Sequence, residues 1–148
     1  MTSLETHVRI ERTVEEVFDY VSDPLSFPTW NSAATEVSPI STGGSDGVGA
    51  TYSIVRELLA GRVENVLEVV ARERPRRFAI RTISGPTPFA YEFRFSADGS
   101  ATVVAVELHA ELGAIQSLLG PLAQVRLRRG VDANLATLKG VLETVNRR

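Results

Sequence analysis

Residues 89–109 read FAYEFRFSADGSATVVAVELH, with two alternating runs of apolar and polar residues on either side of Asp98-Gly99. Asp-Gly favours a two-residue hairpin turn, because both positions tolerate a positive φ. The stretch therefore predicts two antiparallel strands that share one apolar face. A hairpin centred there places the following residues opposite one another: Phe95 and Thr102, Phe93 and Val104, Tyr91 and Val106, Phe89 and Leu108. The other face then carries Glu92, Arg94, Glu107 and His109.

Two earlier hairpins give the same inner face. A turn at Pro75-Arg76 places Leu67, Val69 and Ala71 beside Ile80 and Phe78. A turn at Ala60-Gly61 pairs four inward residues with four on the next strand: Tyr52 with Val69, Ile54 with Leu67, Arg56 with Asn65, and Leu58 with Val63. Because faces must agree across each hairpin, the three turns together predict an antiparallel meander.

The first 30 residues predict a strand followed by two short helices. Val8 and Ile10 alternate with Arg9 and Glu11, so we expect a strand there, with His7 preceding it. Thr13 to Glu16 form a capping box, and a helical apolar face follows at Val14, Val17, Phe18 and Val21. Asp23-Pro24 ends this helix and can open a second helical turn through Phe27, Pro28 and Trp30. Gly43 to Gly47 predict a flexible turn between the second and third strands.

A long amphipathic helix is expected to close the chain near Asn146. Its stripe is Val131, Leu135, Leu138, Leu142 and Val145. Before it, Gly120-Pro121 should kink or interrupt a segment whose apolar residues are Ile115, Leu118, Leu119, Leu122 and Val125. Such a kink fits either a pocket mouth or a helix that bends over its sheet.

These elements predict one α+β domain over residues 1–148. One sheet with nearly all of its helix at the end of the chain buries its apolar face by curving around that helix. We therefore expect a seven-stranded antiparallel curved sheet around a long C-terminal helix, with two short helices after the first strand. A curved sheet around a helix tends to leave a cavity, which predicts a site for an apolar ligand.

Composition excludes several classes of function. The chain has 148 residues, a net charge of −2 and no cysteine, so nucleic-acid binding, disulfides and thiol chemistry are not expected. The only two histidines, His7 and His109, have no second ligand near them, and we expect no metal and no cofactor. The sequence has no phosphate-binding loop, no nucleophile elbow and no paired acids, so no catalytic residue is assigned. Without a signal peptide or a membrane-spanning stretch, a cytoplasmic protein with no integral membrane association is expected, as a monomer or homodimer.

The chain resembles the START-like superfamily, also described as the Bet v 1-like (SRPBCC) helix-grip fold, and within it the bacterial polyketide cyclase/dehydrase and lipid-transport proteins. The resemblance covers nearly the whole chain. Its motifs are residues 13–24 (TVEEVFDYVSDP), Trp30, Gly61-Arg62, residues 74–78 (RPRRF), residues 84–86 (SGP) and residues 134–143 (NLATLKGVLE). It implies the helix-grip fold and a hydrophobic small-molecule ligand. These motifs consist of caps, turns and packing residues, so they specify no reaction.

Residues of the inner face and of the start of the closing helix are the predicted ligand-binding set. They are Trp30, Tyr52, Ile54, Arg56, Asn65, Leu67, Val69, Phe78, Ile80, Phe89, Tyr91, Phe93, Leu118, Leu119 and Leu122. Arg56 is the polar exception, and the register places no acid opposite it. Because an unpaired buried guanidinium is costly, we hypothesise that a ligand carboxylate or carbonyl pairs with it. The alternative is that Arg56 reaches the rim of the sheet or that a bulge turns it outward.

Three functions are consistent with this reading. The first is binding or carriage of a hydrophobic or amphipathic molecule, lipid-like or polyketide-like, and it is favoured because the predicted pocket holds no His, Cys, Asp or Glu. The second is a cyclase or dehydratase in which polar groups polarise carbonyls and Tyr or water transfers protons. The third is an interaction module that uses the outer face, where Val55, Val66 and Val70 lie among charges.

Overall fold

The computed structural model describes residues 2–58, 61–110 and 122–145. The strands are β1 (Thr2–Ile10), β2 (Ala34–Ser41), β3 (Thr51–Leu58), β4 (Gly61–Glu73), β5 (Arg77–Ser84), β6 (Phe89–Asp98) and β7 (Ala101–Ala110). The helices are α1 (Val14–Val21), the 3-10 turn η1 (Pro24–Ser26), α2 (Phe27–Trp30) and α4 (Ala123–Val145). The predicted fold class is confirmed.

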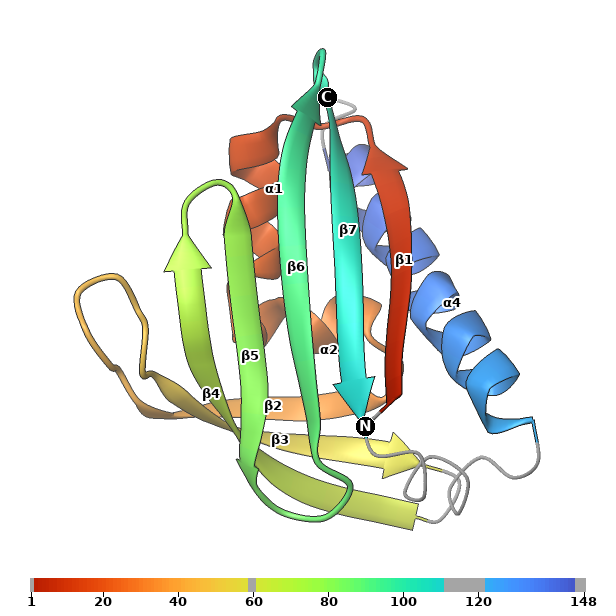
Figure 1. Cartoon of the computed structure of the whole chain (residues 1–148). Coiled ribbons are helices and arrows are strands. Elements are labelled where there is room, and N and C mark those ends of the chain that lie inside the picture. The colour runs from red at the N-terminus through yellow and green to blue at the C-terminus, as the bar shows by residue number, and fades with distance from the viewer. Residues whose placement is uncertain (1, 59–60, 111–121, 146–148) are drawn as a thin grey trace.

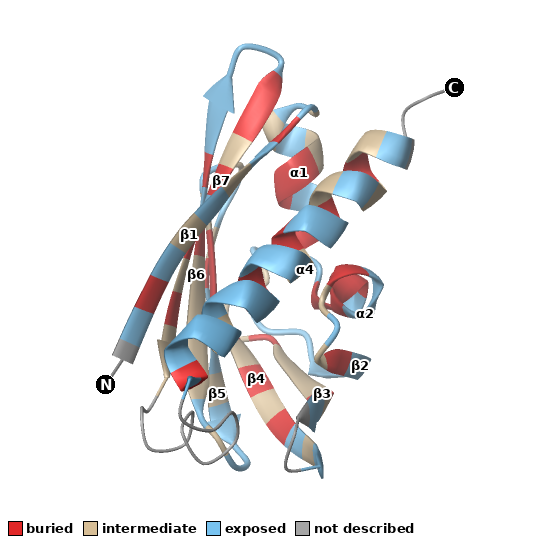
Figure 2. Ribbon diagram, turned by 90° about the vertical axis from the view of Figure 1, so that its right-hand side faces the viewer, coloured by how far each residue is buried: buried red, intermediate tan, exposed pale blue. Residues whose placement is uncertain are grey.

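The seven strands form one antiparallel sheet in the order β1-β7-β6-β5-β4-β3-β2. The sheet curves, and the helices lie on the same side of it (Figures 1 and 2). The core residues of the strands face α4 and the two N-terminal helices, so one continuous core fills the space between the layers. This arrangement buries the sheet's apolar face as its sequence pattern requires.

The predicted faces of the β6–β7 hairpin are confirmed, but its register is not. Phe93 and Phe95 are buried in the core, and Phe89 and Tyr91 pack against it. Phe95 lies opposite Val104 and Phe93 opposite Val106, two residues away from the predicted partners. The turn residues are Gly99 and Ser100 rather than Asp98 and Gly99, since Asp98 pairs with Ala101. An offset of two preserves every face, because side chains alternate with a period of two.

The β3–β4 hairpin differs from the prediction by the same offset. Arg56 lies opposite Val63, Ile54 opposite Asn65 and Leu58 opposite Gly61. Residues 59–60 lie outside the described residues. Arg56 and Asn65 are therefore diagonal neighbours on one face, not direct partners.

A bulge in β4 overturns the predicted position of Ala71. The register shifts between Val69 and Ala71, so Ala71 pairs with Ala79 and lies on the outer face. The next residue, Arg72, turns inward, and its guanidinium lies 5.4 Å from the ring centroid of Phe18 on α1. One extra residue in a strand reverses the faces that follow it, and no turn residue in the sequence marks it.

The N-terminal segment is longer and more regular than predicted. β1 begins at Thr2, so His7 lies within the strand and pairs with Ala105. The Thr13 hydroxyl accepts from the Glu16 N–H, as the capping box requires. The Glu16 carboxylate accepts from the Thr13 hydroxyl at 2.9 Å and pairs with Arg12, instead of capping a backbone N–H. The Asp23 carboxylate caps η1 by accepting from the Leu25 N–H at 3.1 Å.

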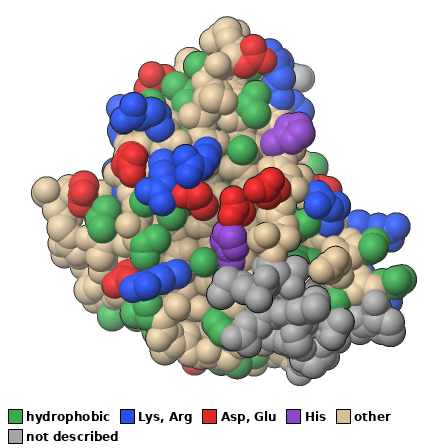
Figure 3. Space-filling view, viewed as in Figure 1, with side chains coloured by type: hydrophobic (Ala, Val, Ile, Leu, Met, Phe, Trp, Pro, Cys, Tyr) green, Lys and Arg blue, Asp and Glu red, His purple; other side chains and the backbone are tan. Residues whose placement is uncertain are grey.

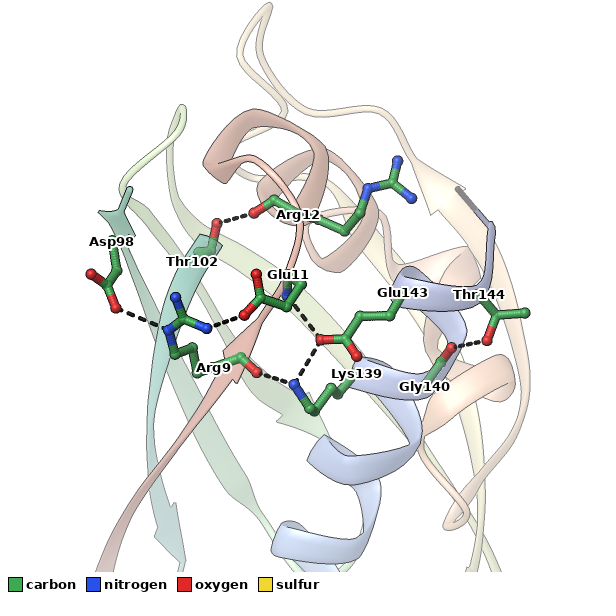
Figure 4. Close-up of polar contacts among 9 residues, drawn as sticks. All are labelled: Arg9, Glu11, Arg12, Asp98, Thr102, Lys139, Gly140, Glu143 and Thr144. Carbon is green, nitrogen blue, oxygen red and sulfur yellow. Dashed lines mark hydrogen bonds and ion pairs between the residues drawn. The ribbon is translucent and has the colours of Figure 1, made fainter. Parts of the chain in front are cut away.

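The C-terminal half of α4 is fixed to the end of β1 (Figure 4). Lys139 Nζ donates to the Arg9 carbonyl at 2.7 Å, and Glu143 accepts from the Glu11 N–H at 2.9 Å. Arg12 donates to the Leu142 carbonyl at 2.8 Å. Of the predicted stripe, Val131, Leu135, Leu138 and Leu142 are buried. The Val145 side chain, Asn146, Gly120-Pro121, Ile115, Leu118 and Leu119 lie outside the described residues.

Candidate ligand-binding cavity

A cavity of about 520 Å3 lies between the inner face of the sheet and the first half of α4. Its floor consists of residues from β3 to β7, and its roof comes from α2 and from α4 between Arg126 and Leu135. Most of the lining is apolar, with Ile80, Phe93, Val106 and Leu108 from the sheet and Leu135 from the helix. The cavity thus lies between the curved sheet and the N-terminal half of α4.

The predicted ligand-binding set divides into three groups. Eight of its residues line the cavity: Trp30, Ile54, Arg56, Leu67, Ile80, Phe89, Tyr91 and Phe93. Tyr52, Asn65, Val69 and Phe78 lie in or beside the core but not in the cavity wall. Leu122 does not line it either and is 60% exposed. Leu118 and Leu119 lie outside the described residues. That any of these residues binds a ligand stays a prediction.

An asparagine network that the sequence analysis missed lies at one side of the cavity. Asn134 on α4 accepts from the Ser32 N–H at 3.0 Å and donates to Asn31 Oδ1 at 3.1 Å. These bonds tie the chain after α2 to α4, and all three residues line the cavity. The signal available in the sequence was Asn134 itself, which interrupts the apolar side of the helix one residue before Leu135.

Arg56 lines the cavity and is only partly exposed, as hypothesised, but its guanidinium is not without partners. Nε donates to Asn65 Oδ1 at 3.0 Å, and Nη2 donates to the carbonyls of Pro86 and Thr87 and to the Thr87 hydroxyl. Its Cζ lies 4.4 Å from the centroid of the Phe89 ring. These partners are neutral, and burial lowers the Arg56 pKa. The positive charge therefore meets no carboxylate among the described residues.

The conformation of the loop between β5 and β6 depends on the Arg56 and Asn65 side chains and on Gly85. Asn65 Nδ2 donates to the carbonyls of Ser84 and Pro86, at 3.2 and 2.8 Å. Gly85 has a φ of +98°, and a Cβ there would lie 2.4 Å from the Glu64 carbonyl oxygen. Arg56 and Asn65 thus hold residues 84–88 against β4, at the edge of the cavity.

Tyr91 presents a second polar group to the cavity beside Arg56. No hydrogen bond among the described residues involves its hydroxyl, and its ring stacks on Phe93 with centroids 5.6 Å apart. Burial raises the Tyr91 pKa to about 12. At neutral pH the phenol is therefore protonated and available as a donor.

The raised pKa of Tyr91 predicts a loss of stability at high pH. Its pKa rises from 10.0 to about 12 on folding, so between these values the folded state binds more protons than the unfolded state. The stabilisation is complete below pH 10.0 and is lost as pH rises to about 12. Urea unfolding across this range should show that Tyr91→Phe is less sensitive to pH than wild type. An identical pH dependence of the two proteins would contradict the assignment.

One carboxylate borders the cavity, contrary to the expectation of none. Glu57 is exposed at its rim, with Arg62 Nη1 3.9 Å away. The rest of the lining, as far as the structure describes it, contains no His, Asp or other Glu.

The outer face of the sheet carries charges of both signs (Figure 3). Its acids are mostly paired: Glu92 with Arg77 and Arg94, Glu68 with Arg81, and Glu107 with His109. No group of His, Asp or Glu in the described ranges is arranged to hold a metal ion. Of the three outer valines, Val55 is only 5% exposed and so offers little surface to a partner.

A curved antiparallel sheet that encloses an apolar cavity with a C-terminal helix defines the START-like, Bet v 1-like (SRPBCC) class of ligand-binding folds. The sequence matches the family described as "Polyketide cyclase / dehydrase and lipid transport" over residues 1–143. The chain belongs to this family. A comparison with curated proteins gave no match.

Solved structures share the fold at low sequence identity. A START superfamily protein from Mycobacterium smegmatis superposes with a TM-score of 0.80 at 16% identity, covering 97% of this chain and 99% of that one. The protein TTHA0849 from Thermus thermophilus gives 0.79 at 16% identity, with coverages of 98% and 99%. Ara h 8.0201 gives 0.70 at 9% identity, with coverages of 97% and 98%. In the described parts of the chain, no helix has both the length and the apolar character needed to cross a membrane.

Proposed function

We propose that this protein binds and carries an amphipathic small molecule, lipid-like or polyketide-like, in the cavity beneath α4. One observation carries the proposal: a cavity of about 520 Å3 with mainly apolar walls contains a partly buried arginine that no described carboxylate neutralises. The volume falls in the range of small-molecule sites, roughly 300–1,000 Å3. The family description, which includes lipid transport, supports the same reading.

The proposed orientation follows from the polar groups. The apolar body of the ligand lies against Phe93, Val106 and Leu135, and its head group meets Arg56 and Tyr91. Both side chains donate hydrogen bonds, so they favour an acceptor, and the uncompensated charge of Arg56 favours an acid over a neutral carbonyl.

Filling the cavity from α4 should weaken the binding of a fluorescent fatty acid. Gly130 and Gly140 are both exposed helical positions where an added Cβ meets nothing within 4 Å, but only Gly130 lines the cavity. Gly130→Trp should weaken the affinity by about tenfold or more, because an indole occupies space that a ligand needs. Gly140→Trp is the matched control and should bind as wild type does. Equal affinities in a fluorescence titration of all three proteins would contradict the proposal.

The second candidate is a cyclase or dehydratase. It is favoured because Arg56 and Tyr91 both line the cavity and interact electrostatically, so that two donors could polarise a substrate carbonyl. With its pKa raised to about 12, Tyr91 could supply a proton but would be a poor base at neutral pH. Product analysis after incubation with a β-keto thioester would distinguish this activity from carriage alone.

A further inference from the structure

The start of α4 exposes an apolar and basic ridge on the side of the helix that faces away from the cavity. Leu122 is 60% exposed and Val125 is 48% exposed, although both are large aliphatic side chains. Arg129 lies four residues after Val125, on the same side of the helix, and is also exposed. We call Leu122, Val125, Arg128 and Arg129 the α4 ridge.

The ridge is positively charged, and its two arginines form no ion pair with a carboxylate of the described residues. No acidic residue occurs between Leu122 and Val131. The Arg128 guanidinium donates to the backbone carbonyl of Glu5 at 2.9 Å, not to a carboxylate. The first acid, Asp132, accepts from the Thr6 hydroxyl at 2.5 Å. Figure 3 shows hydrophobic and basic side chains together at its right-hand edge, where α4 begins in Figure 1.

The position of the ridge links it to the cavity. The opposite side of the same segment supplies Leu127, Gly130 and Val131 to the cavity lining. A surface that contacted the ridge would therefore lie against the outer side of the helix segment whose inner side lines the cavity.

We propose that the α4 ridge docks the protein reversibly on an anionic lipid bilayer. Aliphatic side chains flanked by arginines suit the boundary between head groups and acyl chains, where apolar burial and attraction to anionic lipid act together. Two aliphatic side chains are too few for a stable protein interface, which buries more than about 1,000 Å2 in total. Charge and size thus favour a bilayer over a second copy of the chain.

The test is co-sedimentation of the full chain with vesicles of phosphatidylcholine and phosphatidylglycerol, compared with phosphatidylcholine alone. We expect binding to the anionic vesicles that weakens as salt increases. The variants Leu122→Ser/Val125→Ser and Arg128→Gln/Arg129→Gln should each weaken it by about tenfold or more. Both should retain the wild-type affinity for a fluorescent fatty acid in solution, whereas Gly130→Trp should lose that affinity and still bind vesicles.

Matched controls separate the ridge from general surface effects. Ile40 is 58% exposed on β2, and Figure 1 places the end of that strand across the molecule from the start of α4. Ile40→Ser, and Arg81→Gln/Arg94→Gln on the outer face, should bind vesicles as wild type does. The proposal is overturned if wild type does not bind anionic vesicles or if the controls lose binding equally. It is also overturned if sedimentation shows a dimer that the ridge variants dissociate.

Discussion

Replacing Arg56 with glutamine is expected to weaken the binding of acidic amphiphiles about tenfold or more relative to their uncharged analogues. Glutamine is polar but carries no charge, so comparing an acid with its uncharged analogue isolates the charge-assisted contact. Such a contact contributes about 1.5–3 kcal/mol, which sets the size of the difference. Parallel titrations with a fatty acid and its methyl ester would measure it.

Arg56→Lys is the matched control, because it keeps the charge and should keep the preference for acids. Equal losses for acid and ester in Arg56→Gln would instead mean that the variant has altered the shape of the cavity. Both variants should lose about 1–2 kcal/mol of stability, since they cannot reproduce the bonds to Asn65, Pro86 and Thr87. If the guanidinium were buried without partners, removing it would instead leave the free energy of unfolding unchanged or raise it.

A large loss of stability is expected from Gly85→Ala. A Cβ at this position would lie 2.4 Å from the Glu64 carbonyl oxygen and 2.9 Å from Asn65 Cα, and both are backbone atoms that move only with β4. The φ of +98° adds strain for any residue with a side chain. We expect a loss of about 3–5 kcal/mol in the free energy of unfolding, measured by urea denaturation.

Gly99→Ala separates the clash from the backbone strain. Gly99 also has a positive φ, +62°, but an added Cβ there meets nothing within 4 Å. Gly99→Ala should therefore lower the free energy of unfolding by about 1–2 kcal/mol, the ordinary penalty for a residue with a side chain in the left-handed conformation. If the two variants lost equal stability, the close approach of Gly85 to β4 would not be the reason for a glycine there.

The sequence predicted which face each strand buries better than it predicted which residues pair. Alternation in β3 and β6 identified Ile54, Phe93 and Phe95 as inward. The registers of the β3–β4 and β6–β7 hairpins were wrong by two residues, because moving a turn by one position leaves every face unchanged. The β4–β5 hairpin instead contains a bulge, which reversed the face of Ala71. Burial therefore constrains the face strongly and the register weakly.

The features that were missed depend on contacts between distant segments. The β4 bulge, which turns Arg72 inward, has no glycine or proline to mark it. The bonds of Arg56 to Pro86 and Thr87 span about 30 residues of sequence and fix a loop whose conformation no local pattern specifies. The Asn134 network likewise joins α4 to residues about 100 positions earlier. The periodicity of apolar residues in the sequence indicates which side chains are buried. These contacts form only once distant segments have come together in the folded chain.

The most direct test of the proposed cavity is photo-crosslinking with a fatty acid that carries a diazirine in its acyl chain, followed by peptide mapping by mass spectrometry. The account predicts adducts on cavity-wall residues of the sheet and of α4, such as Phe93, Leu108 and Leu135. An excess of unlabelled fatty acid should suppress these adducts, and Gly130→Trp should form fewer of them. Adducts confined to the outer face of the sheet or to the α4 ridge, with none on the cavity wall, would contradict it.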